Sequence, residues 1–96
     1  MASFKLAPAA QRDLDDIFDY TIVHWGRDQA LSYVDLIEAA CGELARAPHR
    51  APACDHVRKG YRRRTIGRHV IYFRVVPEGI AVMRILHQRI QAPSHL

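Results

Sequence analysis

Residues 61–87 read YRRRTIGRHVIYFRVVPEGIAVMRILH. Three runs within this stretch are rich in Val, Ile, Tyr, Phe and Thr, the side chains typical of strands: residues 61–66, 69–76 and 80–87. Gly67-Arg68 separates the first two runs and Pro77-Glu78-Gly79 the last two, and both are turn-forming sequences. The stretch therefore predicts an antiparallel meander of three strands.

The sequence before this meander repeats with a helical period. Apolar side chains recur every three or four residues between Pro8 and Trp25, and again between Asp28 and Pro48. Pro8 fits the first turn of a helix, Gly26 fits a helix C-terminus, and Asp28 suits the start of the second helix as a cap or a charge. Two helices joined by about three residues must form an antiparallel hairpin. Trp25 is expected to be a core residue that closes it.

Two further segments complete the predicted organisation. Residues 4–7 are a strand candidate that we expect to join the sheet, and residues 47–60 have no clear period and predict a loop. The helical hairpin is expected to cover one face of the sheet. We therefore predict a single α+β domain over residues 1–96, in which the hairpin packs on a small antiparallel sheet in two layers, in the order β-α-α-β-β-β.

Charge is divided unevenly along the chain. Residues 1–48 carry four cationic side chains against eight acidic ones, and residues 49–96 carry ten against two, which gives −4 and +8 and the net charge of +4. A strongly basic second half indicates contact with a polyanion or an acidic protein segment. The alternative is a basic face that is merely solvated.

Other sequence features indicate where the protein is located and whether it binds a metal or a cofactor. No signal peptide or membrane-length apolar run is present, so we expect a cytosolic protein in which Cys41 and Cys54 stay reduced. Cys54, Asp55 and His56, with His49 nearby, match no established zinc spacing. No phosphate-binding glycine loop is present. The sequence therefore predicts neither a metal site nor a cofactor.

The densest group of candidate site residues is cationic and lies at the start of the meander: Arg58, Lys59, Arg62, Arg63 and Arg64. On a strand, Arg62 and Arg64 point to one face and Arg63 to the other. Arg74 and Arg84 interrupt otherwise apolar strands, where a guanidinium must reach solvent, an acid or a ligand. Two interpretations stay open. The arginines bind an acidic segment or a phosphate backbone, or they pair with helix acids, for which the candidates are Asp13, Asp16 and Asp19.

Catalysis on RNA is a further alternative. Cleavage would need a general base, a general acid and cations around one phosphate. The candidates are His69, Tyr72, Arg74, Arg84, His87 and Arg89. The chain has only two lysines, Lys5 and Lys59, and no Glu within the three predicted strands. This shortage favours a binding protein, and no catalytic residue is assigned.

Several short motifs occur in a characteristic order along the chain. They are Ala10-x-x-Asp13-Leu14-x-x-Ile17-x-x-Tyr20, Trp25-Gly26, Gln29-Ala30 with Tyr33, Leu44-Ala45 with Pro48, Val57-Arg58-x-Gly60-Tyr61-Arg62, Gly67-x-His69-x-Ile71-Tyr72, Arg84-Ile85-Leu86-His87 and His95-Leu96. Each motif alone is weak, but their order and spacing over nearly the whole chain resembles the ParE branch of the ParE/RelE toxin superfamily.

The resemblance implies a fold and a function. The expected fold is the RelE-like one, a helical hairpin on a small antiparallel sheet. The expected function is that of a type II toxin, which poisons DNA gyrase and blocks replication without catalysis of its own. A ParD-like antitoxin would neutralise it through a disordered C-terminal segment that folds along the toxin, while the antitoxin's N-terminal part binds operator DNA. The alternatives are a ribosome-dependent mRNA endoribonuclease of the RelE branch and a detoxified relative that acts only as a co-repressor.

Two sets of contact residues follow from the charge pattern together with the resemblance. The antitoxin is expected to bind Arg58, Tyr61, Arg62, Arg63, Arg64, Arg74 and Arg84. The target is expected to contact the end of the last strand and the tail, because the family pattern extends to the end of the sequence: His87, Arg89, Ile90, His95 and Leu96. For the tail, the alternative is a terminus that packs through Ile90 and frays after Pro93.

Overall fold

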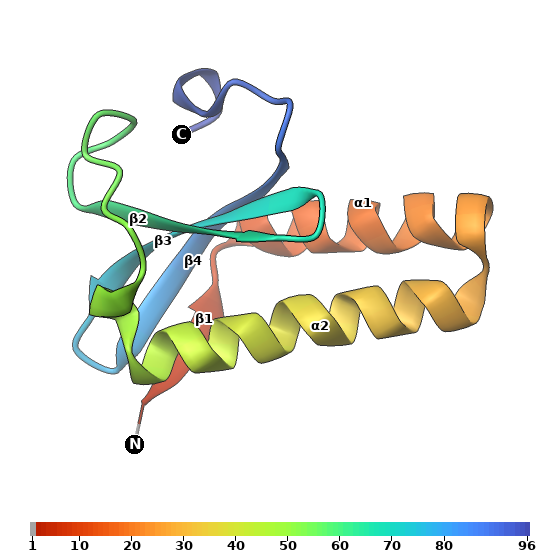
Figure 1. Cartoon of the computed structure of the whole chain (residues 1–96), viewed down its shortest axis with the longest axis horizontal. Coiled ribbons are helices and arrows are strands. Elements are labelled where there is room, and N and C mark those ends of the chain that lie inside the picture. Colours follow the sequence, from red (N-terminus) through yellow and green to blue (C-terminus); the bar gives the residue numbers. More distant parts are fainter. Residues whose placement is uncertain (1) are drawn as a thin grey trace.

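Two helices lie across one face of a four-stranded sheet (Figure 1). The computed structural model describes residues 2–96. In chain order the elements are β1 (Ser3–Leu6), α1 (Pro8–Trp25), α2 (Arg27–Arg46), the short 3-10 helix η1 (Pro48–Arg50), β2 (Tyr61–Ile66), β3 (His69–Val76), β4 (Gly79–His87) and the 3-10 helix η2 (Ala92–Ser94). The predicted α+β class and the order β-α-α-β-β-β are confirmed.

The sheet is mixed, with the strand order β1-β4-β3-β2. β2, β3 and β4 form the predicted antiparallel meander. β1 pairs parallel with β4, with Ser3 opposite Gly79 and Leu6 opposite Val82. The prediction of an antiparallel sheet is therefore wrong for one strand. The helical hairpin returns the chain to the end of the sheet at which β1 begins, so β2 and then β4 run in the same direction as β1 (Figure 1).

The pairing of β1 with β4 depends on a glycine. Gly79 has a φ of 149°, and a Cβ atom placed on it would lie 1.9 Å from the carbonyl oxygen of Ser3. The Ser3 N–H donates to the carbonyl of Glu78 at 2.8 Å. Only glycine allows the two backbones to approach this closely, so Gly79 belongs to β4 as well as to the predicted turn.

The helical hairpin is tighter than predicted. Pro8 begins α1, and Gly26 alone separates α1 from α2, with a φ of 91°. The expected link of about three residues is therefore wrong, because a single residue with positive φ reverses the chain. Asp28 lies in the first turn of α2 and no side-chain hydrogen bond caps that helix. The predicted loop over residues 47–60 contains η1 and a bridge from Ala53 to Arg62.

The main hydrophobic core fills the space between the helices and the sheet. Its fully buried members include Ile37 of α2, Ile71 and Phe73 of β3, and Ile80 and Val82 of β4. A smaller cluster covers the opposite face of the sheet, which we call the outer face: Cys54, Tyr61, Val70, Tyr72, Leu86 and Ala92, with Val57, Met83 and Leu96 packed against it. The sheet is thus covered by helices on one side and by loop and tail residues on the other.

Trp25 does not lie in this core. It is 66% exposed at the end of α1, close to the similarly exposed Val23 and Tyr20. The hairpin extends past the sheet, so its far end has no second layer on which to pack (Figure 1). The prediction of Trp25 as a core residue is therefore wrong, because helical periodicity gives a direction for each side chain but not the length of the sheet beneath it.

Cys41 and Cys54 are both free and buried. Burial, with a contribution from the charge of Glu38, raises the pKa of the Cys41 thiol to about 11, so this thiol stays protonated near neutral pH. Among residues 2–96, no helix combines the length and the apolar character that crossing a membrane would require.

A carboxylate on α1 joins that helix to β4. Asp13 Oδ2 accepts from Arg84 Nε at 2.7 Å and from the Ile85 backbone N–H at 2.9 Å, and Asp13 Oδ1 accepts from Arg84 Nη2 at 2.8 Å. β1 ends at Leu6, opposite Val82, so the next part of β4 has no neighbouring strand on that side. Asp13 thus provides the acceptor for an edge N–H that would otherwise lack a partner in the sheet.

A β-bulge lies directly before Arg84 in β4. Phe73 pairs with Val82 and Tyr72 with Arg84, which leaves Met83 without an opposite residue. One extra residue in β4 changes the direction of the side chains that follow it. The Arg84 and Asp13 side chains are only 24% and 13% exposed, so the ion pair is shielded from solvent on most sides.

We predict that Asp13→Ala lowers the free energy of unfolding by about 2–3 kcal/mol, because it leaves a partly buried guanidinium and a backbone N–H without their acceptor. Urea denaturation followed by circular dichroism measures this. Asp16→Ala is the matched control, since Asp16 is an exposed acid on the same helix, and we expect a change within about 0.5 kcal/mol. Equal effects of the two substitutions would show that the Asp13 contacts contribute nothing specific.

Candidate functional site

The predicted basic cluster is divided between the two faces of the sheet. Arg62 and Arg64 pair in register with Phe73 and Ile71, whose side chains belong to the core under the helices. Arg63 pairs with Tyr72, which belongs to the cluster on the outer face. The strand alternation expected from the sequence is therefore present, and the seven residues predicted to bind an antitoxin do not form one continuous patch.

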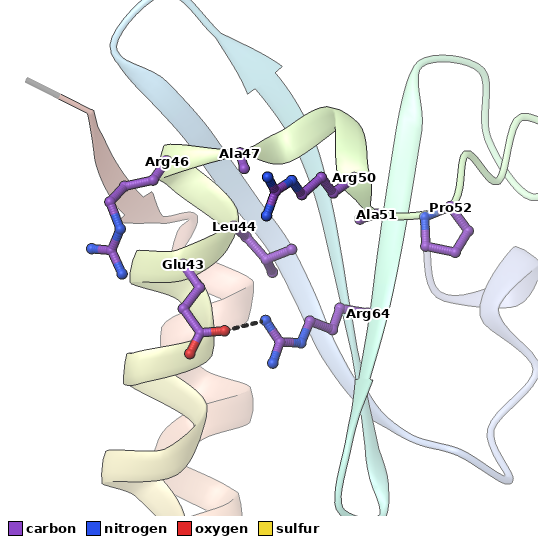
Figure 2. A pocket seen from close by; sticks show the side chains of 8 residues that line it. All are labelled: Glu43, Leu44, Arg46, Ala47, Arg50, Ala51, Pro52 and Arg64. Atoms are coloured by element: carbon purple, nitrogen blue, oxygen red, sulfur yellow. Dashed lines mark hydrogen bonds and ion pairs between the residues drawn. The ribbon is translucent and has the colours of Figure 1, made fainter.

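On the helix side, Arg64 lies at the rim of a pocket of about 560 Å³, which we call the α2–β2 pocket. α2, η1 and β2 enclose it, as Figure 2 shows. Its lining residues are Glu43, Leu44, Arg46, Ala47, Arg50, Ala51, Pro52 and Arg64. In Figure 2 the side chain of Arg64 points from β2 toward Glu43 on α2, and that of Arg50 points from η1 toward the C-terminal end of α2.

The charges in this pocket are not balanced. Arg64 Nη1 lies 2.8 Å from Glu43 Oε2, and the hydrogen bond and charge of Arg64 lower the pKa of Glu43. Within residues 2–96, neither Arg46 nor Arg50 forms a salt bridge. The pocket therefore presents the two cations Arg50 and Arg64 and one carboxylate beside the apolar side chain of Leu44, whereas the side chain of Arg46 points away from Arg64 in Figure 2.

Arg62 has a structural contact. Its Nη1 donates to the Ala51 carbonyl at 2.6 Å, which fixes the end of η1 beside β2. The neighbouring backbone of β2 pairs with the same loop. The Arg63 N–H donates to the Pro52 carbonyl at 3.1 Å, and the Cys54 N–H donates to the Tyr61 carbonyl at 2.8 Å. The first half of the β2 edge is thereby covered by the loop.

Four of the predicted antitoxin-binding residues gather on the outer face. Arg63 and Arg74 are exposed there, and Arg74 pairs in register with Tyr61. The guanidinium of Arg58 lies 5.7 Å from the centre of the Tyr61 ring, which is within the range of a cation–π contact. Arg58 also donates to the carbonyl of Leu96. This surface is cationic, with the buried aromatic ring of Tyr72 beneath it.

Arg84 is engaged inside the protein. Its hydrogen bonds to Asp13 raise the pKa of the guanidinium, although burial opposes this effect. Its Nη1 also donates to the His95 carbonyl at 3.0 Å. Of the two interpretations that the sequence left open for Arg84, the structure contains the pairing with a helix acid. Arg84 therefore connects α1, β4 and the tail.

The residues predicted to contact a target are spread over a wider region. His87, at the end of β4, lies on the helix side, where its ring meets the edge of His69 at a centroid distance of 5.4 Å. Arg89 and Ile90 are exposed just after β4. His95 and Leu96 lie against the outer face, held by Arg84 and Arg58. The tail thus contacts the surface predicted to bind an antitoxin.

The candidate catalytic residues do not converge on one point. His69 and His87 are on the helix side of the sheet, whereas Tyr72 is on the outer face and only 5% exposed. The Nδ1 atom of His69 lies 2.6 Å from the hydroxyl of Tyr33 on α2, and His87 Nδ1 accepts from the Arg89 backbone N–H at 3.2 Å. Burial, and then the charge of His87, lower the pKa of His69.

Sequence reasoning missed three residues of the α2–β2 pocket and the partner of His69. Glu43, Arg46 and Arg50 follow one another at helical spacing around the end of α2, and this was the available signal. That Glu43 faces Arg64, however, depends on how α2 and β2 pack. Tyr33 was part of a family motif, but nothing in its spacing pointed to His69. In the part of the chain that the structure describes, no three His, Cys, Asp or Glu side chains gather as metal ligands would.

Comparison with known proteins gives a consistent result over the whole chain. The family model described as ParE toxin of type II toxin-antitoxin system, parDE, matches residues 4–92. Toxin ParE1 of Mycobacterium tuberculosis (strain H37Rv) is 42% identical over 94 residues, which cover 97% of this chain and 96% of that protein. Toxin ParE1 of Caulobacter vibrioides is 35% identical over 96 residues, which cover 100% of this chain and 99% of that protein.

Solved structures agree with the sequence relatives. A chain of the chromosomal ParDE system from P. aeruginosa superposes with a TM-score of 0.78 at 28% identity, covering 91% of this chain and 96% of that one. A chain of the RelBE2 toxin-antitoxin complex from Mycobacterium tuberculosis has a TM-score of 0.59 at 20% identity, which supports the RelE-like fold alone. From the family match and the two relatives together, this chain belongs to the ParE family of type II toxin-antitoxin toxins.

Proposed function

We propose that this toxin inhibits DNA gyrase, acting in the cytoplasm by binding rather than by catalysis, and that a ParD-like antitoxin neutralises it. Membership of the ParE family supports the gyrase target, and the structural similarity to a chain of a ParDE system supports the partner. The antitoxin would also carry the complex to operator DNA through its own N-terminal part. One observation supports binding rather than catalysis: candidate catalytic residues lie on opposite faces of the sheet.

A ribonuclease site needs an acid, a base and cations within reach of a single phosphate. In this chain, His69 and His87 lie under the helices, and Tyr72 lies on the outer face of the same sheet. One phosphate cannot contact both groups. The same outer face presents Arg63 and Arg74 to solvent, which is an arrangement suited to electrostatic recognition of an acidic partner.

The antitoxin is proposed to contact the outer face through Arg58, Tyr61, Arg63 and Arg74, and the α2–β2 pocket through Arg64. Apolar anchors would provide most of the affinity, and the arginines would set the association rate. Arg62 and Arg84 would contribute indirectly, because their guanidinium groups hold the loop and the tail in place.

The target contact is proposed at the segment after β4. Arg89 and Ile90 are exposed there, next to His87. Arg84 and Arg58 hold His95 and Leu96 against the outer face. An antitoxin bound to that face would therefore contact these two residues, which are also proposed to contact the target. Neutralisation would then include a competition for His95 and Leu96.

The proposed activity has a direct test. Purified toxin, gyrase, relaxed plasmid and ATP should give a loss of supercoiling and an accumulation of linear, gyrase-cleaved DNA, and a ParD-like antitoxin should reverse both effects. Folded toxin that leaves gyrase unaffected but cuts transcripts in a translating extract would contradict the proposal and favour the endoribonuclease of the RelE branch.

The proposed role of the outer face predicts a kinetic defect. Arg63→Gln combined with Arg74→Gln should slow association with the ParD-like antitoxin about tenfold at low salt and reduce its dependence on ionic strength, because two exposed charges that steer the encounter are removed. Stopped-flow fluorescence measures the rate. Arg12→Gln combined with Arg27→Gln removes the same charge from the helices and serves as the control. An equal slowing in both variants would rule out a specific role for the outer face.

A further inference from the structure

The α2–β2 pocket has the chemical character of a carboxylate site. Arg50 and Arg64 contribute two positive charges, and Leu44 and Ala51, both buried, form apolar parts of the wall. A guanidinium pair beside an apolar surface matches an acidic side chain, in which methylene groups lead to a charged head.

Glu43 indicates which anion the pocket selects. Its carboxylate faces Arg64 in Figure 2 and accepts from Arg64 Nη1 at 2.8 Å. The pocket thus already holds one carboxylate, supplied by its own wall. α2, η1 and β2 enclose the site on three sides, which suits a single acidic side chain better than a continuous phosphate backbone.

This internal ion pair is suited to exchange. The side chains of Arg64 and Glu43 are 34% and 56% exposed, and exposed ion pairs contribute little to the stability of a fold. Arg50, which forms no salt bridge within residues 2–96, lies on the same pocket wall as a second donor. An incoming carboxylate could therefore gain two guanidinium partners while Glu43 turns to solvent.

We propose that the α2–β2 pocket binds one glutamate or aspartate side chain of the antitoxin's acidic segment, which displaces Glu43 from Arg64 and is shared between Arg64 and Arg50. Glu43 then acts as an internal competitor that weakens the complex. The inference rests on the proposed function, because it requires an acidic antitoxin, but it concerns a site separate from the outer face.

The test measures the equilibrium affinity of the purified chain for the ParD-like antitoxin by titration calorimetry. Arg64→Gln and Arg50→Gln should each weaken binding about tenfold, the size expected for the loss of one charge-assisted hydrogen bond. Glu43→Gln should strengthen binding several-fold. In the Arg64→Gln background the gain from Glu43→Gln should disappear, because the competition is for that guanidinium.

Two control substitutions separate local exchange from bulk charge. Glu38→Gln removes an acid from the exposed surface of the same helix, and Arg27→Gln removes a cation from the far end of α2. Both should leave the affinity within about twofold. Thermal unfolding of every variant verifies that the fold is intact.

Several outcomes would overturn the inference. If Glu38→Gln raises the affinity for the antitoxin as much as Glu43→Gln does, only overall charge matters. The same follows if Glu43→Gln still raises the affinity in the Arg64→Gln background. Loss of binding to a short DNA duplex in Arg50→Gln and Arg64→Gln, with antitoxin affinity unchanged, would assign the pocket to phosphate. If the antitoxin does not bind even the unsubstituted chain, the proposed partner itself is wrong. If it binds the unsubstituted chain and the pocket variants equally well, only the role of the pocket is wrong.

Discussion

The carboxylate of Asp13 joins three parts of the chain that are far apart in sequence. It accepts from the Arg84 side chain and from the Ile85 backbone, and Arg84 in turn holds the carbonyl of His95. The Arg84–Asp13 ion pair therefore fixes α1 to β4 and holds the tail over the outer face. Its carboxylate also accepts a hydrogen bond from the Ile85 N–H at the edge of β4. The candidate binding surface depends on this pair although Asp13 does not belong to it.

The arginines of this chain divide into two groups with different physical roles. Arg62 and Arg84 use their guanidinium groups within the protein, on a loop carbonyl and on a helix carboxylate. Arg50, Arg63 and Arg74 are exposed on either side of the sheet. Part of the positive charge in the second half of the sequence therefore serves the fold, and the exposed part is the one we propose for binding a partner.

The sequence was sufficient for features that are set locally and insufficient for those set by packing. The period-two runs and their turns gave the bounds of β2 and β3, because strand patterns and turn residues are local properties. The parallel direction of β1 and the exposure of Trp25 depend on where the helical hairpin ends relative to the sheet. The sequence also offered several helix acids as partners for Arg84. In the structure Asp13 is the partner, and neither this choice nor the bulge at Met83 can be read from spacing.

We propose that this toxin acts on replication and not on translation. The most direct measurement follows DNA synthesis and protein synthesis together, as incorporation of labelled thymidine and methionine, in the first minutes after the toxin is induced in growing bacteria. If the toxin inhibits gyrase, thymidine incorporation falls first while methionine incorporation continues, and co-expression of the antitoxin prevents the fall. An immediate loss of methionine incorporation, with DNA synthesis continuing, would contradict it.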